Sequence, residues 1–163
     1  VADLAVRVAS RMGMAARERR ELRRAALLHD LGTLAVSSTI LEKVEHLSGE
    51  EIAAIREHAG DAADIIGRVP RLEAVAEVVR RHTERLNGSG YPAGLTASAI
   101  TLPARILAVA DVADALSHER PNSGGLAPGA VVGRLREMAA AGQLCGMVVE
   151  TAGGVIAPEE SIQ

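Results

Sequence analysis

The stretch from His82 to Pro92 reads H-T-E-R-L-N-G-S-G-Y-P and interrupts a chain that is otherwise rich in Ala, Leu and Val. It contains Tyr91, the only Phe, Tyr or Trp residue of the protein, so the core is built without these large aromatic side chains. Glycine reaches backbone angles that are closed to other residues, and Pro92 stiffens the end of the stretch, which predicts a loop with Tyr91 as a loop contact. His82 ends an apolar helical stripe that starts at Leu72. His82 is therefore either a metal ligand at a pocket wall or a core histidine bonded to a carbonyl group, and this stretch alone leaves both open.

The length and composition indicate one globular domain. The chain has 163 residues, 48% of them hydrophobic and 24% charged, which is enough for a substantial core. A net charge of −3 offers no basic surface for a DNA or RNA duplex. No apolar run is long enough to span a bilayer and no signal peptide opens the chain, so we expect no membrane partner. The single cysteine, Cys145, excludes an internal disulfide, and we expect a cytoplasmic protein.

The spacing of caps, breakers and apolar residues predicts an all-α fold, a bundle of about seven to nine helices. No segment of about four to eight residues alternates between apolar and polar side chains as a half-buried strand would. Ser48 and Glu51 form a predicted capping box, and the helix after it is expected to bury one face. That face carries Ile52, Ile55, His58, Ala62 and Ile65. The other predicted helices span residues 1–13, 15–31, 38–43, 71–83, 103–117, 130–141 and 143–152.

The two ends of the chain set the expected domain boundaries. Residues 1–6 already read as the interior of a helix, so we expect an N-terminally truncated domain from a longer protein. Residues 120–129 are rich in Gly and Pro, which predicts an exposed linker or lid. The chain from Gly153 onward is expected to be loose. These boundaries give a domain of residues 1–152 and a flexible tail of residues 153–163.

Several predicted helices carry an ionisable group on their apolar face or at their apolar end. His58, His82 and Asp111 lie on such faces, and a fourth helix ends in His29-Asp30. Burying an unpaired charge costs several kcal/mol, so five such groups in one core need a common partner. A divalent metal fits this requirement, because imidazole and carboxylate together suit Fe, Mn, Zn or Ni.

The order and spacing of these residues resemble the HD-GYP subgroup of the HD metal-dependent phosphohydrolase superfamily. The resemblance covers roughly residues 15–150. An adjacent His-Asp pair alone is a weak signal, but the full series in the right order is strong. The series consists of His29-Asp30, His58, His82, G-S-G-Y-P at residues 88–92, D-V-A-D-A-L at residues 111–116 and Arg120-Pro121.

The resemblance implies an HD-domain helical bundle around metals, most often iron or manganese. It implies hydrolysis of cyclic dinucleotides, chiefly cyclic di-GMP, to the linear dinucleotide or to GMP. Carried over by position, His29, Asp30 and Asp111 would hold one metal, and Asp30, His58 and His82 would hold the second. Asp30 would bridge the two and is the predicted catalytic residue. We expect up to two divalent transition metals per chain, with Fe or Mn favoured and Zn, Ni or Mg also compatible.

The resemblance also implies a substrate side and a supporting residue. Arg120 falls where the family places a phosphate-binding arginine, whose guanidinium group suits a phosphate. Gly90 and Tyr91 would line the substrate side of the centre. Glu84 would lie behind the metal ligands and support them.

Several positions depart from the family pattern. Thr83 replaces the second of two adjacent histidines, so a third metal is not expected. Thr33 stands in place of a lysine, Asn87 in place of an aspartate, and Pro121-Asn122-Ser123 in place of Pro-Tyr and a basic residue. A further histidine ligand of the family would lie upstream of Val1.

Three hypotheses about function follow. The first is a metal-dependent phosphodiesterase that acts on a cyclic dinucleotide, with possible regulatory domains elsewhere in the parent chain. The second is a degenerate sensor or interaction domain that keeps the fold without turnover. The third is an HD phosphohydrolase for another phosphoester. The intact ligand residues favour an enzyme, whereas Thr33, Thr83 and Asn87 favour the sensor.

Overall fold

The computed structural model describes residues 1–41, 43, 47–118 and 124–158. In this part of the chain the fold contains eight α-helices, two short 3-10 helices and no strand, which confirms the all-α prediction. The elements are α1 Ala2–Arg11, α2 Ala16–Leu28, η1 Leu31–Ala35, α3 Ser38–Leu41, α4 Gly49–Gly67, α5 Glu73–Arg81, η2 Ala97–Ala99, α6 Leu102–Ser117, α7 Pro128–Ala140 and α8 Gly146–Ile156. None of the described helices is both long and apolar enough to cross a membrane.

Helix starts follow the local sequence signals. The Ser48 hydroxyl accepts a hydrogen bond from the Glu51 amide at 3.2 Å, and the Glu51 carboxylate accepts one from the Ser48 amide at 2.6 Å. This is the predicted capping box, and α4 begins directly after it. Pro103 and Pro128 stand in the first turns of α6 and α7, where a missing N–H costs nothing.

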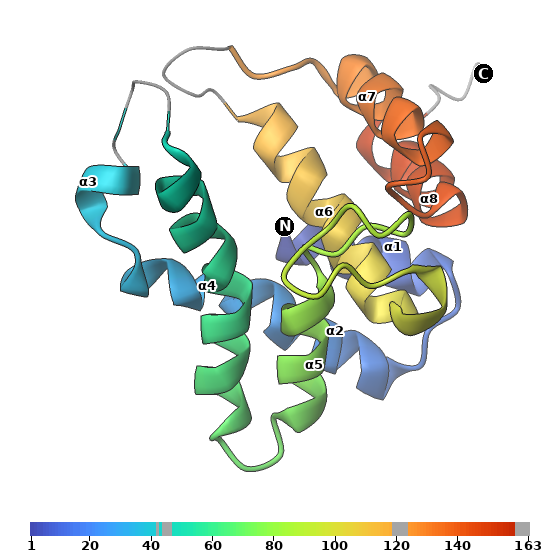
Figure 1. Cartoon of the computed structure of the whole chain (residues 1–163). Coiled ribbons are helices and arrows are strands. Elements are labelled where there is room, and N and C mark those ends of the chain that lie inside the picture. The colour runs from blue at the N-terminus through green and yellow to red at the C-terminus, as the bar shows by residue number, and fades with distance from the viewer. Residues whose placement is uncertain (42, 44–46, 119–123, 159–163) are drawn as a thin grey trace, which may run out of the picture.

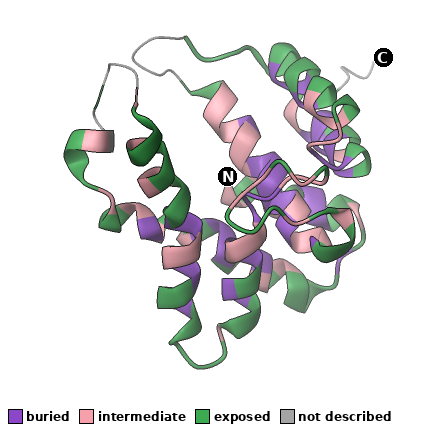
Figure 2. Ribbon diagram, in the orientation of Figure 1, coloured by how far each residue is buried: buried purple, intermediate pink, exposed green. Residues whose placement is uncertain are grey.

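Helix α6 lies at the centre of the bundle and contacts α1, α2, α5, α7 and α8 (Figure 1). Figure 2 shows the buried residues gathered around it. Its buried side chains are mostly small, namely Ala104, Ile106, Leu107, Ala108, Val109, Ala110 and Ala113. Small side chains let helices approach closely, which explains how this core can close without Phe or Trp. Helices α4 and α5 form an antiparallel pair beside it (Figure 1).

The predicted buried face of α4 was wrong in part. Ile52 and Ile65 are exposed to 38% and 47%. The helix instead buries His58, Ala59, Ala62, Ala63 and Ile66. Helix α4 packs mainly against α5 and η1, and its first turns extend beyond the end of α5 (Figure 1). Sequence periodicity cannot reveal where the packing partners of a helix end.

The expected boundary at Gly153 also needs correction. Helix α8 continues to Ile156, and both Gly153 and Val155 are buried. A Cβ atom at Gly153 would lie 3.2 Å from a methyl group of Val132, so the backbone of α8 packs closely against α7 here. The folded domain therefore extends beyond residue 152, whereas residues 159–163 of the predicted tail lie outside the described residues. Most of the predicted linker at 120–129 precedes α7, and its first four residues also lie outside the described part.

Gly32 should be essential for stability because its Cα faces the backbone of α4. A Cβ atom at this position would overlap the carbonyl oxygen of His58 and lie 2.8 Å from the Ala62 nitrogen. We predict that Gly32→Ala lowers the free energy of unfolding by about 1–3 kcal/mol, as overpacking does. The control is Gly60→Ala, a position within α4 with no atom within 4 Å of the added Cβ, and this substitution should be stabilising. Urea unfolding measures the free energy of unfolding of both variants. An unchanged value for Gly32→Ala would contradict the close approach of Gly32 to the backbone of α4.

Candidate metal centre

Three histidines from three different helices converge on one point. His29 follows the last residue of α2, His82 follows the last residue of α5, and His58 lies within α4. All three are buried. Their rings contact one another edge to face, with centroids 5.3 Å apart for His29 and His82 and 6.0 Å apart for His58 and His82.

The Nδ1 atom of each histidine faces the backbone carbonyl of the residue three positions earlier. The distances are 3.0 Å from His29 to Ala26, 2.6 Å from His58 to Ile55 and 2.6 Å from His82 to Val79. A carbonyl oxygen can only accept a hydrogen bond, so Nδ1 must carry the proton. In the neutral ring, Nε2 then presents its lone pair, which is the state of a metal-binding imidazole.

Asp111 from α6 and Asp30 complete the set of charged groups. The ligand atoms of His29, His82 and Asp111 lie within 4.8 Å of one another. The Nε2 atom of His29 lies 3.2 Å from Oδ2 of Asp30 and 3.4 Å from Oδ1 of Asp111. Two carboxylates and two imidazole nitrogens thus face the same small volume.

The electrostatics of this volume favour a cation. Burial lowers the pKa of His82 to about 4, so its imidazole is neutral at pH 7. Burial also lowers the pKa of His29, but the carboxylates of Asp111 and Asp30 outweigh this effect and raise it above its usual value. Burial raises the pKa of Asp111, but His29, His82 and Arg85 together hold it below its usual value. The carboxylate of Asp111 therefore stays charged and attracts a positive species placed beside it.

The residues fit a divalent transition metal. The Nε2 atoms of His29 and His82 are buried and have no hydrogen-bond partner. A buried polar atom without a partner costs free energy, and here one potential ligand atom each of His29, His82 and Asp111 lie within 4.8 Å of one another. Imidazole nitrogen with carboxylate oxygen is the donor set of Fe, Mn, Zn and Ni sites. A bound metal would satisfy all of these atoms at once.

The structure groups the predicted ligands differently from the family-based assignment. His29, His82 and Asp111 form the tight cluster, although the resemblance assigns His82 to a different metal from the other two. His58 adjoins the cluster through its ring contact with His82. The side chain of Asp30 is 66% exposed, and it reaches the cluster through its contact with His29. The division of the ligands between two metals stays a prediction.

The loop after α5 is held by the residues that follow His82. The buried carboxylate of Glu84 accepts hydrogen bonds from the amides of Ala93 at 2.8 Å and Leu95 at 2.9 Å. The buried hydroxyl of Thr83 donates to the carbonyl oxygen of Tyr91 at 2.7 Å. Glu84 therefore organises the loop, and its hydrogen bonds in the described part of the chain go there rather than to the ligands.

Gly90 has a packing role in the same loop. A Cβ atom at this position would overlap the backbone of Glu84 and Arg85, so only glycine lets the loop fold back on the segment that follows α5. Tyr91 follows and places its ring 6.4 Å from that of His58, between centroids. Gly90 and Tyr91 thus border the centre, and their contact with substrate stays a prediction. Arg120 lies outside the described residues.

Two arginines near the centre were not found from the sequence. The guanidinium group of Arg85 donates to the carbonyl oxygens of His82 and Glu84, at 3.3 and 3.0 Å. Burial lowers the pKa of Arg85, partly opposed by the nearby Asp111 and Glu84 carboxylates. The guanidinium carbon of Arg56 lies 5.4 Å from the ring centre of Tyr91. Arg56 and Arg85 lie within three residues of His58 and His82 in the sequence. Charged residues are common on solvated surfaces, so the sequence alone did not indicate a role for either arginine.

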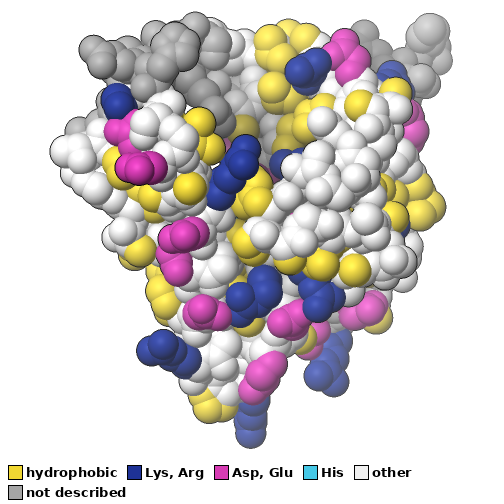
Figure 3. All heavy atoms as spheres, in the orientation of Figure 1, with side chains coloured by type: hydrophobic (Ala, Val, Ile, Leu, Met, Phe, Trp, Pro, Cys, Tyr) yellow, Lys and Arg dark blue, Asp and Glu magenta, His cyan; other side chains and the backbone are white. Residues whose placement is uncertain are grey.

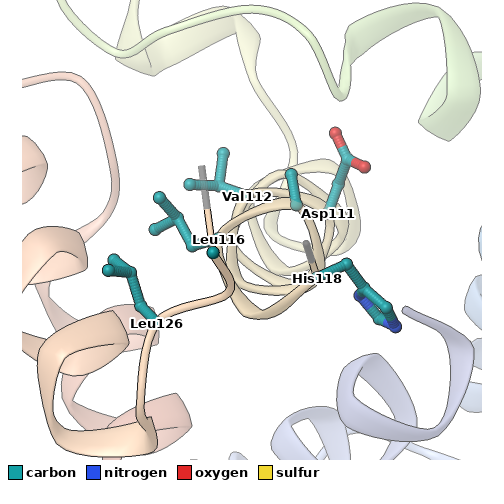
Figure 4. A pocket seen from close by; sticks show the side chains of 7 residues that line it. Asp111, Val112, Leu116, His118 and Leu126 are labelled. Carbon is teal, nitrogen blue, oxygen red and sulfur yellow. The ribbon is translucent and has the colours of Figure 1, made fainter. Parts of the chain in front are cut away.

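A cavity of about 420 Å³ opens beside Asp111. Figure 4 shows the carboxylate of Asp111 and the ring of His118 on one side of the end of α6, with Val112, Leu116 and Leu126 on the other. The centre therefore adjoins a space with a largely apolar wall and a charged edge, which is typical of small-molecule sites.

Comparisons with known proteins identify the family of this chain. The family model described as HD domain matches residues 1–144. The chain is 40% identical over 114 residues to 3'3'-cGAMP-specific phosphodiesterase 3 of Vibrio cholerae, covering 70% of this chain and 25% of that protein. It is 40% identical over 116 residues to the cyclic di-GMP phosphodiesterase response regulator RpfG of Xanthomonas campestris, covering 70% of this chain and 31% of that protein.

A solved structure supports the fold. The HDG"Y"P protein Bd1817 of Bdellovibrio bacteriovorus aligns with a TM-score of 0.75 at 19% identity, covering 95% of this chain and 49% of that one. The chain thus spans about a quarter to a third of the two curated relatives' lengths. By its family match, its motifs and these relatives, the chain belongs to the HD domain family, within its HD-GYP subgroup.

Proposed function

We propose that this chain is the catalytic domain of a metal-dependent phosphodiesterase that hydrolyses a cyclic dinucleotide, preferably cyclic di-GMP, to the linear dinucleotide or GMP. The observation that carries the proposal is the pair of buried, unpartnered Nε2 atoms of His29 and His82 facing Asp111. Two relatives that are 40% identical to this chain are named as phosphodiesterases of cyclic di-GMP and of 3'3'-cGAMP. Because those proteins are longer, we also propose that regulatory domains accompany this one in its parent chain.

The roles of the residues follow from their geometry. Bound divalent metal would supply an activated water molecule and neutralise the negative charge of the phosphodiester. The Nδ1–carbonyl hydrogen bonds hold His29, His58 and His82 in the tautomer that leaves Nε2 free. Asp30 and Asp111 would supply the negative charge that holds a bound metal, and Asp30 is the proposed bridging and catalytic residue. The cavity beside Asp111 offers room for a nucleotide.

A sensor without turnover is the second candidate, and two hydroxyl groups favour it. Thr83 occupies the place of a second histidine, and its hydroxyl group donates a hydrogen bond to the Tyr91 carbonyl oxygen. Thr33 occupies the place of a lysine, and its hydroxyl donates to the carbonyl oxygen of Asp30 at 2.7 Å. Neither side chain brings a charge to a phosphate. The phosphodiesterase should therefore be slower than relatives that keep the lysine and both histidines.

Metal binding should show in the stability of histidine variants. The metal binds only the folded state, so His58→Ala and His82→Ala should lower the melting temperature of metal-loaded protein about 5–10 °C more than that of metal-free protein. His118→Ala is the matched control, because the side chain of His118 is 72% exposed and contacts Asp114 rather than the cluster. Calorimetry of both forms tests this prediction. Equal losses in both forms would show that His58 and His82 are packing residues.

Turnover should depend on the charge of Asp30. Asp30→Asn should lower the hydrolysis rate of cyclic di-GMP about a hundredfold or more, because a metal would lose its anionic ligand. Asp3→Asn, which removes an exposed carboxylate of α1, is the control and should hydrolyse at the wild-type rate. Chromatography of the products from iron- or manganese-loaded protein follows the reaction, with 3'3'-cGAMP compared in parallel.

Each outcome of this assay assigns the function. Faster hydrolysis of 3'3'-cGAMP would correct the proposed substrate. Binding of either dinucleotide without product would decide for the sensor. Hydrolysis that survives Asp30→Asn unchanged would remove Asp30 from the proposed site.

A further inference from the structure

Arg56 reaches the edge of the centre although its helix position points elsewhere. It lies two residues before His58 in α4, so the two side chains leave the helix about 200° apart. The exposed Arg56 side chain nevertheless carries its guanidinium group over the ring of Tyr91, with 5.4 Å between its central carbon and the ring centre. A cation over an aromatic face at this distance is attracted by the ring. The contact therefore holds the charge of Arg56 beside Tyr91 and His58.

The platform under Arg56 is fixed to the metal centre. The backbone of Tyr91 is tied to Thr83 by two hydrogen bonds, from the Thr83 hydroxyl to the Tyr91 carbonyl at 2.7 Å and from the Tyr91 amide to the Thr83 carbonyl at 3.4 Å. Thr83 is the residue after His82. The ring of Tyr91 also lies 6.4 Å from that of His58. The guanidinium group of Arg56, which contacts the ring of Tyr91, is thus held near the candidate metal ligands His58 and His82.

The guanidinium group of Arg56 is available, whereas that of Arg85 is not. Arg85 donates to two backbone carbonyl oxygens. In the part of the chain that the structure describes, Arg56 forms no ion pair and no hydrogen bond. Its planar set of N–H donors matches a phosphate group. Figure 3 shows basic side chains bordering the hollow between α4 and the loop after α5.

We propose that Arg56, held on the face of Tyr91, binds the non-reacting phosphate of a cyclic dinucleotide while the other phosphate lies at the metal centre. This inference rests on the proposed function. A cyclic dinucleotide carries two phosphodiester groups, and only one can lie at the centre during a turnover. The second phosphate needs a positive group of its own, outside the space that His29, His82 and Asp111 enclose. The ring of Tyr91 contacts Arg56 on one side and lies near the ring of His58. The guanidinium group of Arg56 therefore supplies a positive charge for this second phosphate.

Steady-state kinetics with two substrates test the role of Arg56. One substrate is whichever of cyclic di-GMP and 3'3'-cGAMP the wild-type protein cleaves, and the other is bis(p-nitrophenyl) phosphate, which has a single phosphate. Arg56→Ala should raise KM for the dinucleotide about tenfold or more and change kcat less than about threefold. The increase in KM should be much smaller for bis(p-nitrophenyl) phosphate. Arg56→Lys should give an intermediate KM for the dinucleotide, because it keeps the charge without the planar fork.

Two further comparisons separate recognition from general effects. Arg68→Ala removes the same charge at the C-cap of α4 and should leave KM and kcat for both substrates at wild-type values. Tyr91→Phe keeps the ring face and should raise KM for the dinucleotide much less than Tyr91→Leu, which should reproduce much of the Arg56→Ala effect. The Arg56→Ala/Tyr91→Leu double variant should then be little worse than Arg56→Ala alone.

The outcomes distinguish this inference from the proposed function. If the dinucleotide is cleaved and Arg56→Ala resembles the wild type, or weakens both substrates equally, the role of Arg56 is wrong and the proposed function stands. If the wild-type protein cleaves bis(p-nitrophenyl) phosphate but neither dinucleotide, the proposed function fails and the role of Arg56 falls with it.

Discussion

Each histidine of the centre donates a hydrogen bond from Nδ1 to a backbone carbonyl in the preceding turn of its own helix. This local bond fixes the ring orientation and leaves Nε2 directed inward, where two of the three atoms find no partner in the described protein. Burying such atoms without a partner lowers the stability of the folded state. A metal bound to them would stabilise the folded state. Because α2, α4, α5 and α6 surround this point, side chains that are distant in sequence could bind the same metal.

Close backbone approach is the second constraint. Gly32 lets the segment after His29 lie directly on α4 beside His58, and Gly90 lets the loop after α5 fold back on Glu84 and Arg85. Alanine along α6 has the same effect at helix contacts. The side chains of Thr83 and Glu84 then form hydrogen bonds with the loop backbone at Tyr91, Ala93 and Leu95. These bonds fix the loop as the rim of the candidate metal centre. Binding groups on this rim are therefore positioned before any ligand arrives.

The sequence predicted those features whose causes are local. The capping box at Ser48 and Glu51, the stripe that ends in His82 and the glycine-rich loop depend on a few neighbouring residues. The convergence of the histidines with Asp111 followed from a chemical argument, since buried ionisable groups need a partner. The exposed side of α4 and the length of α8 were missed because they depend on which helices pack alongside. Arg56 was missed because its long side chain leaves α4 on the solvent side and turns back over Tyr91.

The central claim is that the Nε2 atoms of His29 and His82 bind a divalent metal together with Asp111. Anomalous diffraction from crystals of manganese- or iron-loaded protein, recorded on both sides of the absorption edge of the metal, locates that metal directly. We predict a peak between these residues, about 2.0–2.3 Å from both Nε2 atoms, with Nδ1 still bonded to the backbone carbonyls. A metal-loaded crystal without a peak there, or with metal bound only at other residues, would contradict the account.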